Sequence, residues 1–228
     1  TNSTNIPIEV NFTNIVTGFE ASDILIQNGT VSNFASDQLN YTFNISPVSE
    51  GLIIIDIPAD VAKDENNEGN KEASTFSIQY DISSPNPTLN WDLNTFTNQS
   101  SISIDLSFDE KIRNLLSSGF ELTNAIVDTI TGTDSIYSVV INPIENGSLE
   151  VMLKENALFD FAGNKNTSSN LLSIYYDNKK TNLGFINDGR EEDVDFQTSN
   201  KVIESSWSGF EESGSGINEY KWAIGTTP

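Results

Sequence analysis

The sequence predicts an all-β protein in which one antiparallel β-sandwich occurs twice and the beginning of a third β domain follows. Three observations predict this class. Short segments rich in Ile, Val, Phe and Tyr are separated by turn residues along the chain. No long amphipathic helical pattern interrupts them. The chain also resembles itself at a constant spacing, which indicates a duplicated domain.

The repeat has a period of 96 residues, as its first pair of matching segments shows (104 − 8 = 96). Five anchors share this spacing: IEVNF at 8–12 with IDLSF at 104–108, NGTV at 28–31 with NAIV at 124–127, YTFNISP at 41–47 with YSVVINP at 137–143, Gly51 with Gly147, and SIQYD at 77–81 with SIYYD at 173–177. We therefore expect two copies of one domain.

Four segments of the first copy have strand character: residues 8–12, 41–45, 52–57 and 76–80. Turn residues such as the Asn28-Gly29 pair separate them. Short strands at roughly 100 residues per unit favour an antiparallel β-sandwich of immunoglobulin type. The expected core residues are Phe12, Phe43, Ile45, Ile53, Ile55 and Ile78 in the first copy, and Phe108, Val139, Ile141, Leu149, Val151 and Ile174 in the second.

The two copies differ at their beginnings. The second copy has a long lead-in with a predicted first strand, TLNWDL at 88–93. The first copy has only seven residues before Ile8. We therefore expect its first strand to lie upstream of Thr1 or to come from another segment.

After Asp177 the repeat pattern stops. Two further strands are predicted, KVIESSWSGF at 201–210 and INEYKWAI at 217–224, with Trp207, Tyr220 and Trp222 facing a core. So few residues cannot close a sandwich. The expected domains are 1–84 (first strand missing), 85–181 (its repeat) and 182–228 (incomplete).

The segments VTGF (16–19), IPADVAKD (57–64) and DFAGN (160–164) resemble the bacterial Ig-like domains found in tandem arrays in large surface adhesins. Through DFQTS, SWSGF and YKWAIGTTP, the tail resembles a fibronectin type III-like module. The resemblance implies an extracellular, non-catalytic array at the cell surface, whose modules act as stalk or cell-adhesion units.

The composition excludes several functions. With 33 acidic and 11 basic residues, the net charge of −22 repels nucleic acid and anionic membranes. No apolar run approaches the ~20 residues of a membrane helix. The absence of Cys and His removes disulfides, thiol nucleophiles and His-based catalysis. We expect no enzyme.

Calcium is the cofactor that the acidic loops at 62–74 and 158–168 suggest, because hard cations prefer Asp, Asn and backbone oxygens. Both loops place an Asp ahead of a Gly-Asn pair, and an Asp closes the last strand of each copy. Turn formation alone also explains such clusters. The candidate metal ligands are Asp60, Asp64, Asn66, Asn70, Asp81, Asp160, Asn164 and Asp177.

Three functions remain open at this point. A spacer stalk has neighbouring repeats of the same chain as its partners. A binding module recognises a protein or a glycan on a surface. A filament subunit receives the absent first strand of the first copy from a neighbour, by β-augmentation.

Overall fold

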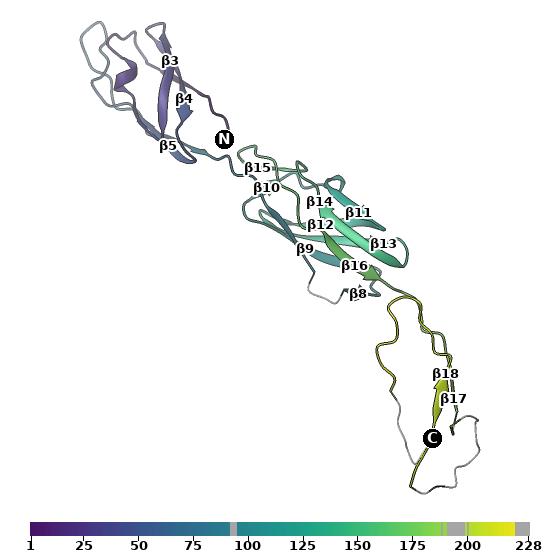
Figure 1. Ribbon diagram of the computed structural model, residues 1–228. Coiled ribbons are helices and arrows are strands. Elements are labelled where there is room, and N and C mark those ends of the chain that lie inside the picture. Colours follow the sequence, from purple (N-terminus) through teal and green to yellow (C-terminus); the bar gives the residue numbers. More distant parts are fainter. Residues whose placement is uncertain (92–94, 188, 191–198, 200, 222–228) are drawn as a thin grey trace. The chain divides into compact units, whose positions relative to one another are not determined.

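The computed structural model describes residues 1–91, 95–187, 189–190, 199 and 201–221. The chain is all-β, with several antiparallel sheets and two one-turn 3-10 helices, η1 (Ala21–Asp23) and η2 (Ser117–Gly119) (Figure 1). It divides into two compact units. The first unit contains residues 1–86, 108–115 and 155–167, and the second contains 87–107, 116–154 and 168–228. The expected all-β fold class is confirmed.

The first unit consists of two three-stranded antiparallel sheets and one short strand pair. One sheet has the order β1-β4-β3, and the other has the order β2-β5-β6. The short pair is β10-β15. The strands are β1 (Ile6–Asn11), β2 (Leu25–Gln27), β3 (Gly29–Ser36), β4 (Asn40–Pro47), β5 (Gly51–Asp56), β6 (Phe76–Tyr80), β10 (Ile112–Arg113) and β15 (Phe159–Asp160).

In the second unit, both main sheets have four strands, in the orders β12-β13-β9-β7 and β11-β14-β16-β8. A separate two-stranded sheet pairs β17 with β18. The strands are β7 (Pro87–Asn90), β8 (Phe96–Thr97), β9 (Ile102–Phe108), β11 (Phe120–Thr123), β12 (Ala125–Thr133), β13 (Ile136–Pro143), β14 (Gly147–Leu153), β16 (Leu172–Tyr176), β17 (Phe185–Asn187) and β18 (Ser206–Ser208).

Equivalent pairings recur 96 residues apart. The isolated bridge between Thr17 and Lys63 has its counterpart in the Arg113–Phe159 pair of β10 and β15. The turns recur as well, because Asn28 and Asn124 both have positive φ, at 60° and 57°. Asn tolerates this left-handed conformation better than most residues do. The Asn28 side chain donates to the Ser49 carbonyl over 2.8 Å, as Asn124 does to that of Glu145.

The cores contain most of the residues that the pattern predicts. In the first unit, Phe43, Ile45, Ile53 and Ile55 are buried, whereas Phe12 and Ile78 are only partly buried. All six predicted positions of the second copy are buried: Phe108, Val139, Ile141, Leu149, Val151 and Ile174. Each fully buried aliphatic or aromatic side chain stabilises the fold by about 1.5–3 kcal/mol.

The last segment differs from the expectation. Only Ser206–Ser208 of the predicted strand 201–210 forms a strand, and its partner is β17, which the pattern does not predict. Residues 217–221 of the other predicted strand form none, so this prediction is wrong there. The next residue, Trp222, lies outside the described residues.

Candidate functional site

Three carboxylates converge in the first unit. Asp81 follows β6, Glu110 follows β9, and Asp160 ends β15. Each offers an oxygen, and these three oxygens all lie within 4.8 Å of one another. Because the residues are far apart in sequence, the pairing of β10 with β15 is needed to position them.

Asp160 is the most deeply buried of the three. It is 1% exposed. One of its oxygens, Oδ1, accepts from the backbone N–H groups of Gly163 and Asn164, and Oδ2 accepts from the Asn164 amide over 2.8 Å. These bonds compensate for the burial of a carboxylate. Asp160 thus accepts hydrogen bonds from Gly163 and Asn164 of its own turn, DFAGN at 160–164.

Asn164 ties this turn to the end of β6 and to the first residues of the chain. Its Nδ2 donates to the Asp81 carbonyl over 2.9 Å, and its Oδ1 accepts from the Asn2 side chain over 3.1 Å. The backbone N–H of Asn2 also donates to the Ala162 carbonyl over 3.2 Å. The loop 160–164 therefore contacts both Asp81 and the N-terminal residues.

A fourth carboxylate, Glu50, lies beside Asp81. Its Oε1 accepts from the backbone N–H groups of Ile82 and Ser83, both over 3.0 Å, and from the Ser83 hydroxyl over 2.8 Å. These bonds lower the pKa of Glu50, the bond from Ile82 most. Asp81 itself accepts from the Ser83 backbone N–H over 3.0 Å.

The like charges of the cluster disfavour full ionisation. Burial raises the pKa of Glu110 to about 7, and the charges of Asp160, Asp81, Asp109 and Glu50 add to this rise. Burial also raises the pKa of Asp81, with smaller contributions from Glu50 and Asp160. A bound divalent cation would remove this repulsion. Carboxylates on loops, with amide and carbonyl oxygens nearby, suit the flexible oxygen shell of calcium.

The predicted ligands of the 62–74 loop stabilise that loop locally. Asp60 pairs with Lys63 over 3.2 Å, and its side chain is 76% exposed. Asp64 Oδ1 accepts from the backbone N–H groups of Asn66 and Glu68, both over 2.9 Å. The side chain of Asn70 bonds the backbone of Pro58, Ala62 and Lys71. These bonds are of the kind expected if the loop residues serve turn formation, which was the alternative to metal binding.

Asp177 lies in the second unit, where it also bonds backbone groups. Its Oδ1 accepts from Lys179 over 3.0 Å and its Oδ2 from Ser215 over 2.6 Å. The bond from Ser215 is the main cause that lowers its pKa.

Of the eight predicted ligands, the structure brings Asp81, Asp160 and Asn164 together. The other five are not part of this cluster. Glu50 and Glu110 were missed. Glu110 lies two residues after the repeat segment IDLSF at 104–108, but so many acidic residues occur in the chain that position alone does not single it out.

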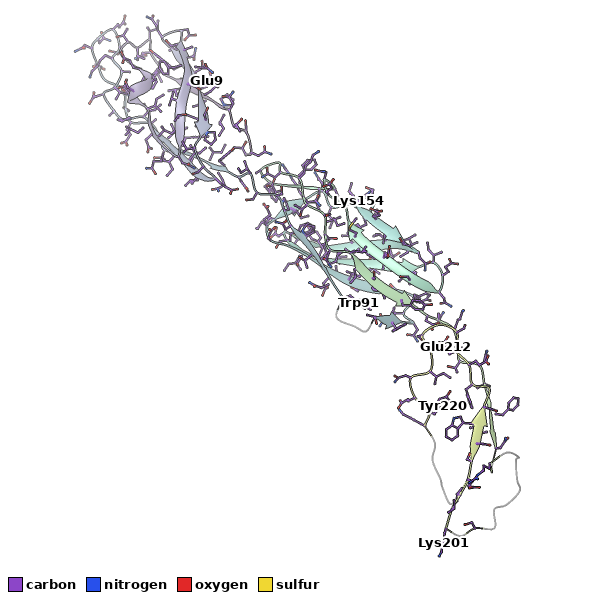
Figure 2. The ribbon with its side chains drawn as sticks, viewed as in Figure 1. Glu9, Trp91, Lys154, Lys201, Glu212 and Tyr220 are labelled. Atoms are coloured by element: carbon purple, nitrogen blue, oxygen red, sulfur yellow. The ribbon has the colours of Figure 1, made fainter. Side chains whose placement is uncertain are left out.

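An apolar cavity lies in the second unit. It measures about 320 Å³, and Trp207, Phe210 and Tyr220 line it together with Ile186 and Ile217. Trp207 and Tyr220 are half exposed, at 50% and 52%, and their ring centroids are 6.1 Å apart. Figure 2 labels Tyr220 and, apart from it, Trp91, which lies directly after β7 and is partly exposed. The three aromatic residues of the cavity form no flat surface for stacking, because the Phe210 and Tyr220 rings are at 79° to each other.

The sheet architecture places the protein in the class of Ig-like β-sandwich proteins. Within that class, residues 1–82 match the family model of a bacterial Ig-like domain. This match covers most of the first unit, including Glu50 and Asp81. No curated protein matches the chain. No helix among the described residues has the length and apolarity needed to cross a membrane.

Proposed function

We propose that the chain is a non-catalytic structural or adhesive segment of a long extracellular surface protein, and that calcium stiffens its first unit. In this proposal, Ig-like domains occur in tandem and a fibronectin type III-like module follows them. The match of residues 1–82 to a bacterial Ig-like domain supports the structural and adhesive role, since such domains usually occur in extracellular or surface proteins. The partners are neighbouring repeats and a protein or glycan on a surface.

The convergence of Asp81, Glu110 and Asp160 is the observation that carries the calcium proposal. A cation shared by these carboxylates would connect the end of β6 to the loops that follow β9 and β15. These segments are otherwise joined by a few polar bonds, such as the one between Asn164 and Asp81. Burial is the main cause of the raised pKa of Glu110, and loss of the carboxylate repulsion that adds to it would contribute to the stabilisation by the cation.

Thermal unfolding with calcium and with a chelator tests the proposal. A ligand that binds only the folded state stabilises it by about 2.7 kcal/mol at a free concentration of a hundred times its Kd. We expect calcium at about 2 mM to raise the Tm of the first unit, and magnesium to raise it less. The substitution Glu110→Gln should remove most of this shift without lowering the Tm in the chelator.

The substitution Glu121→Gln is the matched control, because Glu121 is exposed on β11, in the second unit. This substitution should leave the rise in Tm on addition of calcium unchanged. Melting curves of the wild-type chain that coincide with and without calcium would contradict the calcium proposal, and the acidic loops would then be turns only.

A further inference from the structure

Strand β5 contains four consecutive apolar residues, Leu52–Ile55. Side chains of a strand alternate between the two faces of its sheet. Since Ile53 and Ile55 are buried in the core, Leu52 and Ile54 lie on the outward face of the β2-β5-β6 sheet. Leu52 is 50% exposed. Antiparallel sheets usually carry polar residues on the face that meets solvent, so a continuous apolar run of this kind calls for a reason.

A third aliphatic side chain, on the neighbouring strand β2, extends this apolar surface. Leu25 pairs with Asp56, and Gln27 pairs with Ile54, so Leu25 and Ile54 are diagonal neighbours on the outward face. Diagonal neighbours are about 7–8 Å apart, within reach of long side chains. Leu25 is 56% exposed. We call Leu25, Leu52 and Ile54 the outer strip; all three lie outside the core cluster of the unit and the residues packed against it.

The repeat indicates that the fold does not require apolar residues at these positions. The positions 96 residues after the outer strip, on β11 and β14, are Glu121, Ser148 and Glu150. The other sheet of the first unit also follows the usual rule. Its outward face carries exposed polar side chains, among them Glu9, Thr30, Ser32 and Thr42. The outer strip is therefore a particular feature of one face of the first unit.

The residues around the outer strip are acidic. Asp56 lies directly opposite Leu25, and its Oδ1 accepts from the Thr75 hydroxyl over 2.5 Å. Asp23, which ends η1, precedes Leu25 by two residues, and Glu50 precedes Leu52 by two. The elements η1, β2, β5 and β6 contain no Lys or Arg. A partner that covers the outer strip therefore meets carboxylates at its rim.

We propose that the outer strip docks an amphipathic helix of a partner protein, with an aliphatic stripe flanked by Lys or Arg. Exposed apolar patches with polar rims mark interaction sites. Three side chains on two strands form a narrow surface, which suits the apolar stripe of one helix packed on a sheet. The inference rests on the adhesive role proposed above, because it names a partner for that role, and it does not depend on calcium.

Charge complementarity favours such a partner over a second copy of the chain. Two outer strips packed against each other would bring the Asp56 carboxylates of both copies into one interface, between chains that each carry a charge of −22. Juxtaposed like charges disfavour an interface, whereas basic flanks would complement the acidic rim.

Methyl NMR of the full chain tests this docking. The probe is a synthetic amphipathic helix with Leu along one stripe and Lys on both flanks, added at about 0.15 M salt so that long-range attraction is screened. We expect the methyl signals of Leu25, Leu52 and Ile54 to shift on titration and to saturate. The variant Leu25→Thr, Leu52→Ser, Ile54→Thr keeps the charge of the chain and should bind the peptide at least several-fold more weakly.

The matched control replaces three exposed aliphatic residues that lie outside β2, β5 and β6, by Ile15→Thr, Ile126→Thr and Ile136→Thr. It should bind the peptide as the wild-type chain does. Melting curves without peptide check that both variants are folded, and the methyl shifts of the wild-type chain need no variant at all. A peptide with Glu in place of Lys should bind several-fold more weakly, because the rim is acidic.

Four outcomes would overturn the proposal. Equal affinity of the strip variant and the control would mean that charge alone binds the peptide. Shifts confined to other methyl groups would place docking elsewhere and leave the adhesive role standing. Equal binding of the Glu-flanked peptide would contradict the basic flanks. Self-association of the chain that the strip variant abolishes would make a second copy the occupant. Calcium-dependent melting is measured without peptide, so failure of the calcium proposal is seen separately.

Discussion

Glu110 shows at the scale of one residue how the cluster affects stability. Its pKa is raised to about 7 by burial and by neighbouring carboxylates. An unperturbed Glu titrates near pH 4.3. The folded chain therefore binds this proton more tightly than the unfolded chain does between these values. The resulting stability is fully present below the unfolded pKa and is lost as the pH rises through the folded pKa.

A pH series in the presence of a chelator tests this linkage. We expect the wild-type first unit to lose stability between about pH 4.3 and pH 7, relative to the Glu110→Gln chain. The measurement is the Tm of both chains at several pH values. Parallel pH profiles of the two chains would show that Glu110 does not titrate in this window.

Asn70 illustrates the limit of ligand prediction from residue type. Its side-chain Oδ1 accepts from the backbone N–H of Ala62, and 96 residues later the Oδ1 of Asn166 accepts from the backbone N–H groups of Ala157 and Leu158. Sequence spacing could not distinguish an oxygen that binds the backbone from one that is free for a cation. That distinction depends on the path of the loop.

At the scale of the element, the strands β1 and β9 have related sequences and different surroundings. Ile8 and Ile104 occupy equivalent positions, but Ile104 is fully buried on a strand that has β13 and β7 on its two sides, whereas Ile8 is only partly buried. The alternation of apolar residues predicts both strands. It does not predict the difference in burial, because that depends on the neighbouring strand.

Matched substitutions at Ile8 and Ile104 measure how much the burial of this side chain contributes to stability in each unit. Removal of a fully buried Ile side chain to Ala costs about 2–5 kcal/mol. We expect Ile104→Ala to destabilise the second unit within this range and Ile8→Ala to destabilise the first unit clearly less. Calorimetry of the two unfolding transitions gives both values, and the transition of the unsubstituted unit is the control in each chain. Equal losses would mean that β1 is as well covered as β9.

At the scale of the whole molecule, the excess of carboxylates affects every part of the chain. A net charge of −22 destabilises a compact state through self-repulsion. Salt screens exposed charges, with a Debye length that falls from about 30 Å at 0.01 M to about 3 Å at 1 M.

We therefore expect the Tm of the chain in a chelator to rise by a few degrees as sodium chloride is raised from about 0.01 M to about 1 M. Potassium chloride should have the same effect, which separates screening from binding of a particular cation. A Tm that stays constant or falls over this range would contradict self-repulsion as a significant term.

The sequence alone determined the β class, the 96-residue register, the turn positions and most of the core, because these follow from local alternation and turn chemistry along a duplicated segment. It also determined the acidic surface. Tertiary structure decided which carboxylates meet. The pairing of β10 with β15 and the bonds of Asn164 bring Glu110 and Asp160 to Asp81, and no local pattern encodes these long-range contacts. Tertiary structure likewise decided that Ile8 is less buried than Ile104, because the burial of a side chain depends on strands that are remote in sequence.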